Sequence, residues 1–561
     1  MTASLLIPPG LVLIIGGLLL PFLRGGFRSS VVIALPLVTL ALVWNVPDGT
    51  VLQAPFLGYD LTLVKGDKLS RLFATIFAIM AFAGGLFALN QARTTELAAA
   101  FVYAGSAIGV AFAGDLITLF ICWEVMAIGS TLVVWCGGPR AQDAGFRYAT
   151  IHLFGGVLLM AGIAGEIAAT GSIAFGKLDT STVPRWLILA GFLINAGAPP
   201  LSAWLPDAYP ESSWSGMVFL SAFTTKAAVY VLLRGFPGTE LLIYVGLLMI
   251  FYGIVYAILE NDMRRILAYS IVNQVGFMVA GIGIGTEMAL NGTAAHAFTH
   301  IVYKALLLMS AGSVLYMTGK RKCSDLGGLF RTMPLTTICG IIGALSISSF
   351  PLTSGFVSKS MISEAAANQH LELVWFLLAA ASAGVFLHAG IKFPWFVFFQ
   401  KDSGLRPADP PWNMRLAMVL FSAICVGLGM MPGPLYAMLP YKVDYVPYTA
   451  SHVVSQLQLL LFSGLAFFLM LGWLKRTLTI TLDVDWFYRR LGRNLGNGFD
   501  ALTGRAWQWL VGAFGSGAKR INDKLHRHHG PEGALGRTWP TGTMAFWTTV
   551  MLAAYLILAN L

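Results

Sequence analysis

Seven ionisable residues fall inside long apolar runs of this chain or, for Lys359, just after a proline that ends one, and they are the first candidates for chemistry: Glu124, Lys226, His296, His300, Lys304, Lys359 and Lys392. A charged side chain is costly within a bilayer, so its presence there indicates ion or proton transfer. His296, His300 and Lys304 follow one another at four-residue spacing and would lie on one face of a helix. The types and spacing of these residues predict a proton relay.

Five more polar residues are candidates for a supporting role: Asp115, Asn195, Asp262, Arg264 and His388. Several members of the first set also have simpler explanations. Glu124 could be a protonated side chain that hydrogen-bonds a neighbouring helix, and Lys226 could extend toward an interface. Lys392 could be interfacial, because Pro394 and charged residues follow it closely.

The runs that hold these residues are long enough to be membrane spans. The chain has 561 residues, of which 57% are hydrophobic and 11% charged, and a mean hydropathy of +0.74. This composition excludes a soluble enzyme. A spanning helix needs about 20 apolar residues. The apolar runs predict about sixteen spans, near residues 5–23, 31–46, 69–90, 97–113, 115–136, 147–169, 184–199, 215–236, 241–259, 265–284, 294–317, 334–350, 371–397, 414–432, 457–473 and 545–560.

The net charge of +10 sits in loops and in a C-terminal stretch, which favours anionic lipid over nucleic acid as the partner. The first charge, Arg24, follows the first apolar run, so we expect that run to be a span and not a cleaved signal peptide. Basic residues are more frequent in the odd-numbered loops, which places the N-terminus outside by the positive-inside rule.

An internal repeat is visible in the spacing of three landmarks. Asp115 is followed after 37 residues by His152 and after 48 more by Pro200. Asp262 is followed after 38 residues by His300 and after 51 more by Pro351. Each unit holds five spans, so successive copies enter the membrane from opposite sides. This pattern predicts inverted repeats with helices broken at the prolines, the arrangement typical of ion sites in secondary transporters.

The predicted organisation has six parts. Beyond residue 483, tryptophans alternate with basic residues at helical spacing, which predicts an amphipathic helix at the cytoplasmic face. The parts are an N-terminal three-helix region (1–95), a first repeat (96–236), a second repeat (237–400), C-terminal core helices (401–482), the amphipathic helix (483–544) and a terminal anchor (545–561).

Five scattered cysteines show no metal-ligand spacing, and the chain contains no motif for a redox cofactor. We therefore expect no disulfide, no metal centre and no bound cofactor.

Five segments together carry a family resemblance: GDLITLFICWEVM (114–126), WLPDAYPE (204–211), DMRRILAYS (262–270), HIVYKALL (300–307) and GFVSK (355–359). In this order they resemble the antiporter-like subunits shared by Mrp-type multisubunit cation/proton antiporters and respiratory complex I, most closely the D-type subunits. The resemblance implies an all-α polytopic fold with about fourteen core spans and two inverted five-helix repeats, followed by an amphipathic helix and an anchor. It also implies partner subunits and a bacterial inner membrane.

The resemblance implies roles for individual residues. Glu124 falls on the fifth-span glutamate of the family, Lys226 on the eighth-span lysine, and Lys359 on the residue that ends the relay in the twelfth span. His300 and Lys304 fall on the central relay. Asn195 departs from the pattern, because relatives have a lysine there that pairs with the glutamate. Asparagine carries no charge, so whether the first half conducts protons stays open.

Three functions remain open from the sequence. The first is a proton-translocating subunit of a Na⁺(K⁺)/H⁺ antiporter, in which the chain itself is part of a transporter and not an enzyme. The second is an antiporter-like subunit of a complex I-like or hydrogenase complex. The third is the membrane partner of a solute-uptake module with a partly disabled channel, which Asn195 favours.

Overall fold

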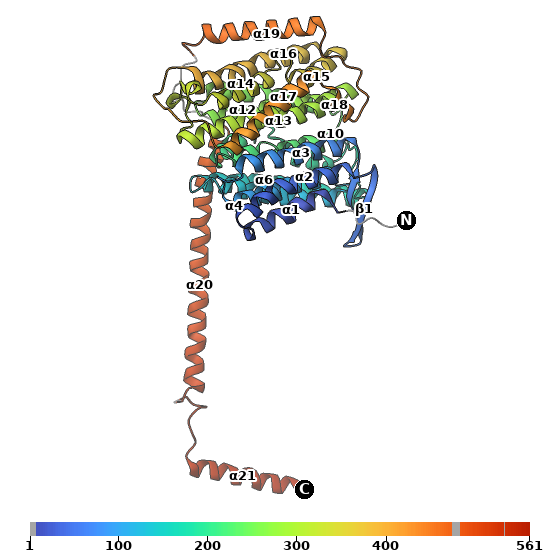
Figure 1. The fold of residues 1–561 in the computed structure, drawn as a ribbon. Coiled ribbons are helices and arrows are strands. Elements are labelled where there is room, and N and C mark those ends of the chain that lie inside the picture. The colour runs from blue at the N-terminus through green and yellow to red at the C-terminus, as the bar shows by residue number, and fades with distance from the viewer. Residues whose placement is uncertain (1–6, 474–482, 532, 561) are drawn as a thin grey trace. The chain divides into compact units, whose positions relative to one another are not determined.

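The computed structural model describes residues 7–473, 483–531 and 533–560. The chain forms two compact units, residues 1–485 and 486–561. In the first unit, helices lie side by side, with α1 and α2 toward one end and α16 and α19 toward the other (Figure 1). The first residues of the predicted N-terminal span, the end of the predicted core-helix region at 474–482, and Leu561 lie outside the described residues.

The helices of the first unit are interrupted by short turns and 3-10 or π-helical segments. They are α1 (Pro9–Leu19), η1 (Leu20–Phe22), α2 (Gly25–Trp44), α3 (Lys68–Ala88), α4 (Thr94–Phe112), α5 (Leu116–Trp135), α6 (Ala141–Thr170), α7 (Val183–Ala196), α8 (Trp204–Ala208), η2 (Tyr209–Glu211), α9 (Gly216–Leu220), α10 (Thr224–Gly235), α11 (Leu241–Leu259), α12 (Met263–Ile284), α13 (Glu287–Thr318), η3 (Cys323–Asp325), η4 (Leu329–Arg331), α14 (Pro334–Ile347), α15 (Phe356–Asn368), α16 (Glu372–Val385), η5 (Phe386–Lys392), η6 (Trp395–Phe399), α17 (Trp412–Met430), α18 (Gly433–Ala437) and α19 (Ala450–Leu469).

Thirteen helices of the described chain are long and apolar enough to cross a membrane, and three shorter apolar helices accompany them. Each predicted span coincides with one of these helices or with a pair that forms one interrupted span. The prediction of a polytopic helical membrane protein is confirmed. One pair of strands was not predicted: β1 (Gly49–Phe56) and β2 (Tyr59–Gly66) form an antiparallel hairpin between α2 and α3.

The predicted breaks lie where the prolines are. α7 ends at Ala196, and the chain runs through Pro199 and Pro200 before α8 begins. In the second repeat α14 ends at Ile347, and Pro351 lies in the turn before α15. Proline lacks an N–H group and disrupts a continuing helix, which explains why both spans are broken at matching places.

The two repeats begin in the same way. Asp115 caps α5 by accepting a hydrogen bond from the Thr118 backbone N–H at 2.7 Å. Asp262 caps α12 by accepting one from the Arg264 backbone N–H at 2.9 Å. Each aspartate also forms an isolated β-bridge with the chain that follows the next helix, at Ala174 and Lys322 respectively. The shared cap and bridge agree with the repeat that the landmarks predict.

Small residues let neighbouring helices approach closely. A Cβ atom on Gly246 of α11 would collide with the backbone of Gly276 and Ala280 of α12. Gly10 of α1 faces Gly105 of α4 in the same manner. Packing through small residues is the usual way in which membrane helices associate, and here it holds the bundle that positions the buried charges.

The second unit contains η7 (Phe487–Gly492), α20 (Arg493–His529) and α21 (Thr541–Ala559). α20 is a single helix of 37 residues with four basic residues in its last turn. α21 is one of the thirteen candidate spans. The placement of α20 at the cytoplasmic face and of α21 as an anchor stays a prediction.

Candidate proton-transfer site

The centre of the candidate site is α13, where His296, His300 and Lys304 are completely buried. This helix packs against α12, α14, α15 and α17. Because the three side chains are four residues apart, they follow one face of the helix through the interior. The structure thus brings together the three residues that the spacing placed on one face.

His296 has hydrogen-bond partners on two other helices. Its Nε2 atom lies 3.1 Å from Gln274 Oε1 on α12, and its Nδ1 atom lies 3.3 Å from Ser358 Oγ on α15. The Tyr303 hydroxyl donates to the same Gln274 oxygen at 3.2 Å. The sequence prediction missed Gln274, Ser358 and Tyr303, since uncharged polar residues within a span carry no distinctive pattern.

His300 and Lys304 differ from His296 in their hydrogen bonding. Neither the ring nitrogens of His300 nor the Lys304 ammonium has a hydrogen-bond partner among the described residues. His300 interacts electrostatically with Lys226, Lys304 and His296. Buried polar groups in proteins are normally paired, so these groups are suited to exchange protons with water or with one another.

Lys226 lies at the start of α10, directly after a break in its span. α9 ends at Leu220 and α10 begins at Thr224. The break frees the Ser221 carbonyl, which accepts a hydrogen bond from Lys226 Nζ at 2.7 Å, and Thr225 Oγ1 accepts a second at 3.1 Å. Lys226 is completely buried, so it does not extend to an interface.

Lys359 is placed by the second broken span. It lies in the first turn of α15, with its ammonium 4.8 Å from the centre of the Phe277 ring on α12. Its Nζ atom has no hydrogen-bond partner among the described residues. Lys359 interacts electrostatically with His296, which connects it to the row on α13.

His388 and Lys392 lie on the π-helical segment η5. His388 interacts electrostatically with Lys304, Lys359 and Lys392. Lys392 Nζ donates to the backbone carbonyls of Ala257, Ile258 and Glu260 at the end of α11. Lys392 therefore satisfies the last carbonyls of a neighbouring helix, a stabilising role that its sequence context did not reveal.

Two other candidates of the first repeat, Glu124 and Asn195, are not members of this row. Glu124 on α5 lies against Gly156 of α6, where a Cβ atom would collide with its carboxylate, and Asn195 on α7 lies against the adjacent Gly155. Glu124 Oε1 and both amide atoms of Asn195 have no hydrogen-bond partner among the described residues. The two candidates therefore lie against neighbouring positions of α6, and position 195 carries an amide where the family pattern has a lysine.

His152 of α6 belongs to the same region. It is buried, stacks on Tyr148 at 3.9 Å between ring centres, and lies edge-on to Trp204 at 4.6 Å. Its Nδ1 atom lies 3.0 Å from the Tyr148 carbonyl. In the sequence analysis His152 is only a landmark of the repeat. Its match with His300 in the second repeat is the signal that could have identified it as a site residue.

Asp115, Asp262 and Arg264 lie at helix ends and act as structural connections. Arg264, which is 3% exposed, donates to the carbonyls of Pro210, Ser212 and Ser213 in the first repeat. Burial raises the pKa of the Asp262 carboxyl, although the Arg321 guanidinium, at 2.8 Å, opposes this shift.

We predict that Arg264→Ala lowers the free energy of unfolding by about 3 kcal/mol, since three buried carbonyls lose a charged donor. Arg415→Ala is the matched control, because Arg415 is exposed on α17. Thermal unfolding of both variants in detergent measures the difference. Equal midpoints for the two variants would contradict the structural role of Arg264.

Comparison with known proteins agrees with this architecture. Residues 113–386 match the family described as NADH:quinone oxidoreductase/Mrp antiporter, TM. The D-type Na(+)/H(+) antiporter subunit of Alkalihalophilus pseudofirmus is 29% identical over 476 residues, which cover 76% of this chain and 95% of that protein. A probable A/B-type K(+)/H(+) antiporter subunit of Rhizobium meliloti is 27% identical over 72% of this chain and 44% of its own length.

Two solved structures share the fold. A chain of the Mrp complex from a Dietzia species superposes with a TM-score of 0.69 at 20% identity, covering 78% of this chain and 96% of that chain. A chain of an archaeal membrane-bound sulfane sulfur reductase has a TM-score of 0.71 at 22% identity and covers 99% of both chains.

The repeated, broken-helix bundle with its buried row of titratable groups is that of a polytopic membrane protein, and it is similar to antiporter-like subunits. Just under half of the chain, residues 113–386, is similar to the NADH:quinone oxidoreductase/Mrp antiporter transmembrane family. The chain is a multi-pass protein of the bacterial plasma membrane, and its relatives are subunits of larger assemblies.

Proposed function

We propose that this chain is the proton-translocating subunit of a multisubunit monovalent cation/proton antiporter, and so part of a transporter and not an enzyme. The observation that carries the proposal is the row of buried basic groups from Lys226 through His300 and Lys304 to His388. Successive members of this row interact electrostatically. A charge on one group therefore affects the protonation of the next, as a relay requires.

The proposed path runs across the bundle, with His296 and Lys359 as a branch toward the second broken span. Ser358 of α15 links this helix to α13. Its hydroxyl lies within hydrogen-bond reach of both His296 and Thr299 of α13, the latter at 2.8 Å. His388 and Lys392 continue the row toward the end of α11. The cation path lies elsewhere in the assembly, in partner subunits or between them.

The test uses inverted membrane vesicles from an antiporter-deficient host that expresses this chain with the genes next to its own. A respiratory substrate sets up a pH gradient, and Na⁺ or K⁺ is then added while a pH-sensitive dye is followed. We expect the cation to dissipate the gradient only in vesicles that contain the chain. Equal dissipation in vesicles without it would contradict the proposal.

A second candidate function is that of an antiporter-like subunit in a complex with a redox module. The observation that favours it is the second unit, α20 and α21, because the fold match to the sulfane sulfur reductase chain extends over nearly the full length. Co-purification of the tagged chain separates the two candidates. Redox-active partners with flavin or iron–sulfur absorption would favour the second, and partners without such absorption the first.

A further inference from the structure

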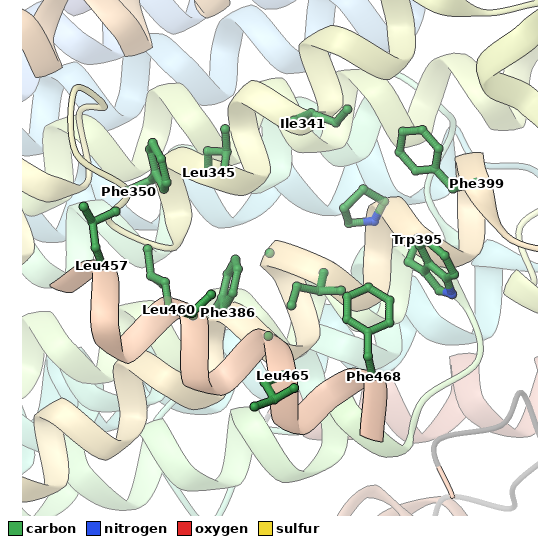
Figure 2. A pocket seen from close by; sticks show the side chains of 15 residues that line it. Ile341, Leu345, Phe350, Phe386, Trp395, Phe399, Leu457, Leu460, Leu465 and Phe468 are labelled. Carbon is green, nitrogen blue, oxygen red and sulfur yellow. The ribbon is translucent and has the colours of Figure 1, made fainter. Parts of the chain in front are cut away.

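An apolar groove lies on one side of the first unit. It has a volume of about 670 Å³ and lies between α14, the π-helical segments η5 and η6, and α19. Figure 2 shows Ile341 and Leu345 on one wall, and Leu457, Leu460 and Phe468 on the opposite wall. The fifteen lining residues include no charged side chain.

Two features shape the groove. Gly464 of α19 has no side chain, and a Cβ atom there would lie 3.5 Å from the Phe386 ring and 3.7 Å from Ile391, in ordinary contact. The edge-on contact of Trp395 with Phe468, at 5.1 Å between ring centres, joins the two walls at one end. The volume lies in the range of pockets that hold one ligand of moderate size.

The groove has one polar group at that end. Trp395 lines it, with its ring nitrogen on the side away from Phe386 (Figure 2). This Nε1–H group is buried and has no hydrogen-bond acceptor among the described residues. A buried donor without an acceptor costs free energy, so a bound molecule with an acceptor at this point would be stabilised.

Basic residues follow directly beyond the same end. Phe399 of the groove stacks on Phe330 at 5.4 Å, and the Arg331 guanidinium lies 5.6 Å from the Phe330 ring. Lys401 comes two residues after Phe399, and both basic residues are exposed. The nearest carboxylate in the sequence, Asp402, is paired with Arg406. The end of the groove is therefore positively charged.

We propose that this groove binds one acyl chain of an anionic phospholipid. The acyl chain lies along the apolar walls, the ester carbonyl accepts the Trp395 N–H, and the phosphate lies near Arg331 and Lys401. The loops that carry both basic residues are cytoplasmic in the predicted orientation, and that leaflet attracts basic residues through its anionic lipids. An uncharged isoprenoid quinone would fill the apolar walls but would bring no negative charge to the two basic residues.

The test uses the purified full-length complex in nanodiscs that contain phosphatidylglycerol with a photoreactive diazirine on its acyl chain. After irradiation, mass spectrometry maps the labelled peptides. We expect label on the segments 386–399 and 457–468. Gly464→Leu should reduce this labelling about tenfold, since the new side chain occupies the groove. Gly427→Leu is the matched control, because a Cβ atom there has no neighbour within 4 Å.

Two more variants test the polar contacts. Trp395→Phe should weaken labelling about fivefold, the factor that one net hydrogen bond contributes. The double variant Arg331→Gln/Lys401→Gln should remove the preference for phosphatidylglycerol over phosphatidylcholine. Equal labelling in Gly464→Leu and Gly427→Leu, or no headgroup preference in the unmodified protein, would overturn the proposal. Displacement of the lipid by a soluble quinone analogue at low concentration would also overturn it.

Discussion

Lys226→Ala should lower cation/proton exchange about a hundredfold, the lower end of what a positioned proton-transfer group contributes. Lys226 lies in the broken span and interacts electrostatically with both His300 and Lys304. Its removal takes the first basic group out of the row. The measurement is the initial rate of cation-induced pH-gradient dissipation in vesicles, divided by the amount of assembled complex on a native gel.

Lys226→Arg separates the charge from proton transfer. Arginine keeps a positive charge but does not release its proton in proteins. We therefore expect Lys226→Arg to assemble normally and to be as inactive as Lys226→Ala. Lys177→Ala is the control, because Lys177 is exposed in the loop after α6. Near-normal exchange in Lys226→Arg would show that the residue supplies only a fixed charge.

Much of this architecture was predictable because each span needs a long apolar run, and because proline marks the breaks after α7 and α14. The hairpin β1–β2 was not predicted, since its residues form a short mixed segment between two strong apolar signals. α15 was not predicted as a helix of its own, because Ser358, Lys359 and Glu364 make it too polar to appear as a span. Its position depends on α13, against which it packs.

The sequence allowed us to predict the charged residues of the site but not the groups that hydrogen-bond them. Buried Lys and His residues are conspicuous in an apolar run, so the row from Lys226 to His388 could be proposed from the sequence. The Gln274 amide that contacts His296 is not conspicuous, and neither are the three α11 carbonyls that bind Lys392. Such contacts depend on which helices pack together, and apolar periodicity does not specify that packing.

The first repeat gives the sharpest test of the site, because the structure places Asn195 and Glu124 beside adjacent glycines of α6. An amide at position 195 gives the Glu124 carboxylate no charge to pair with, so Glu124 contributes little to the row of basic groups that carries the proposed path. We therefore expect Glu124→Gln to reduce exchange less than about threefold, far less than a positioned proton-transfer group would cost.

Asn195→Lys tests whether the absence of a lysine at position 195 is the reason why Glu124 contributes little to exchange. An ammonium at position 195 that pairs with the Glu124 carboxylate should let the single variant fold and assemble. The double variant Asn195→Lys/Glu124→Gln leaves a buried ammonium unpaired, which costs about 3–5 kcal/mol of stability. Thermal unfolding of the wild type, both single variants and the double variant forms a double-mutant cycle that isolates the coupling of the pair. Additive effects would show that the two side chains do not meet.

A large loss of exchange in Glu124→Gln alone would show that another group already compensates Glu124, and that the first repeat conducts protons without the lysine.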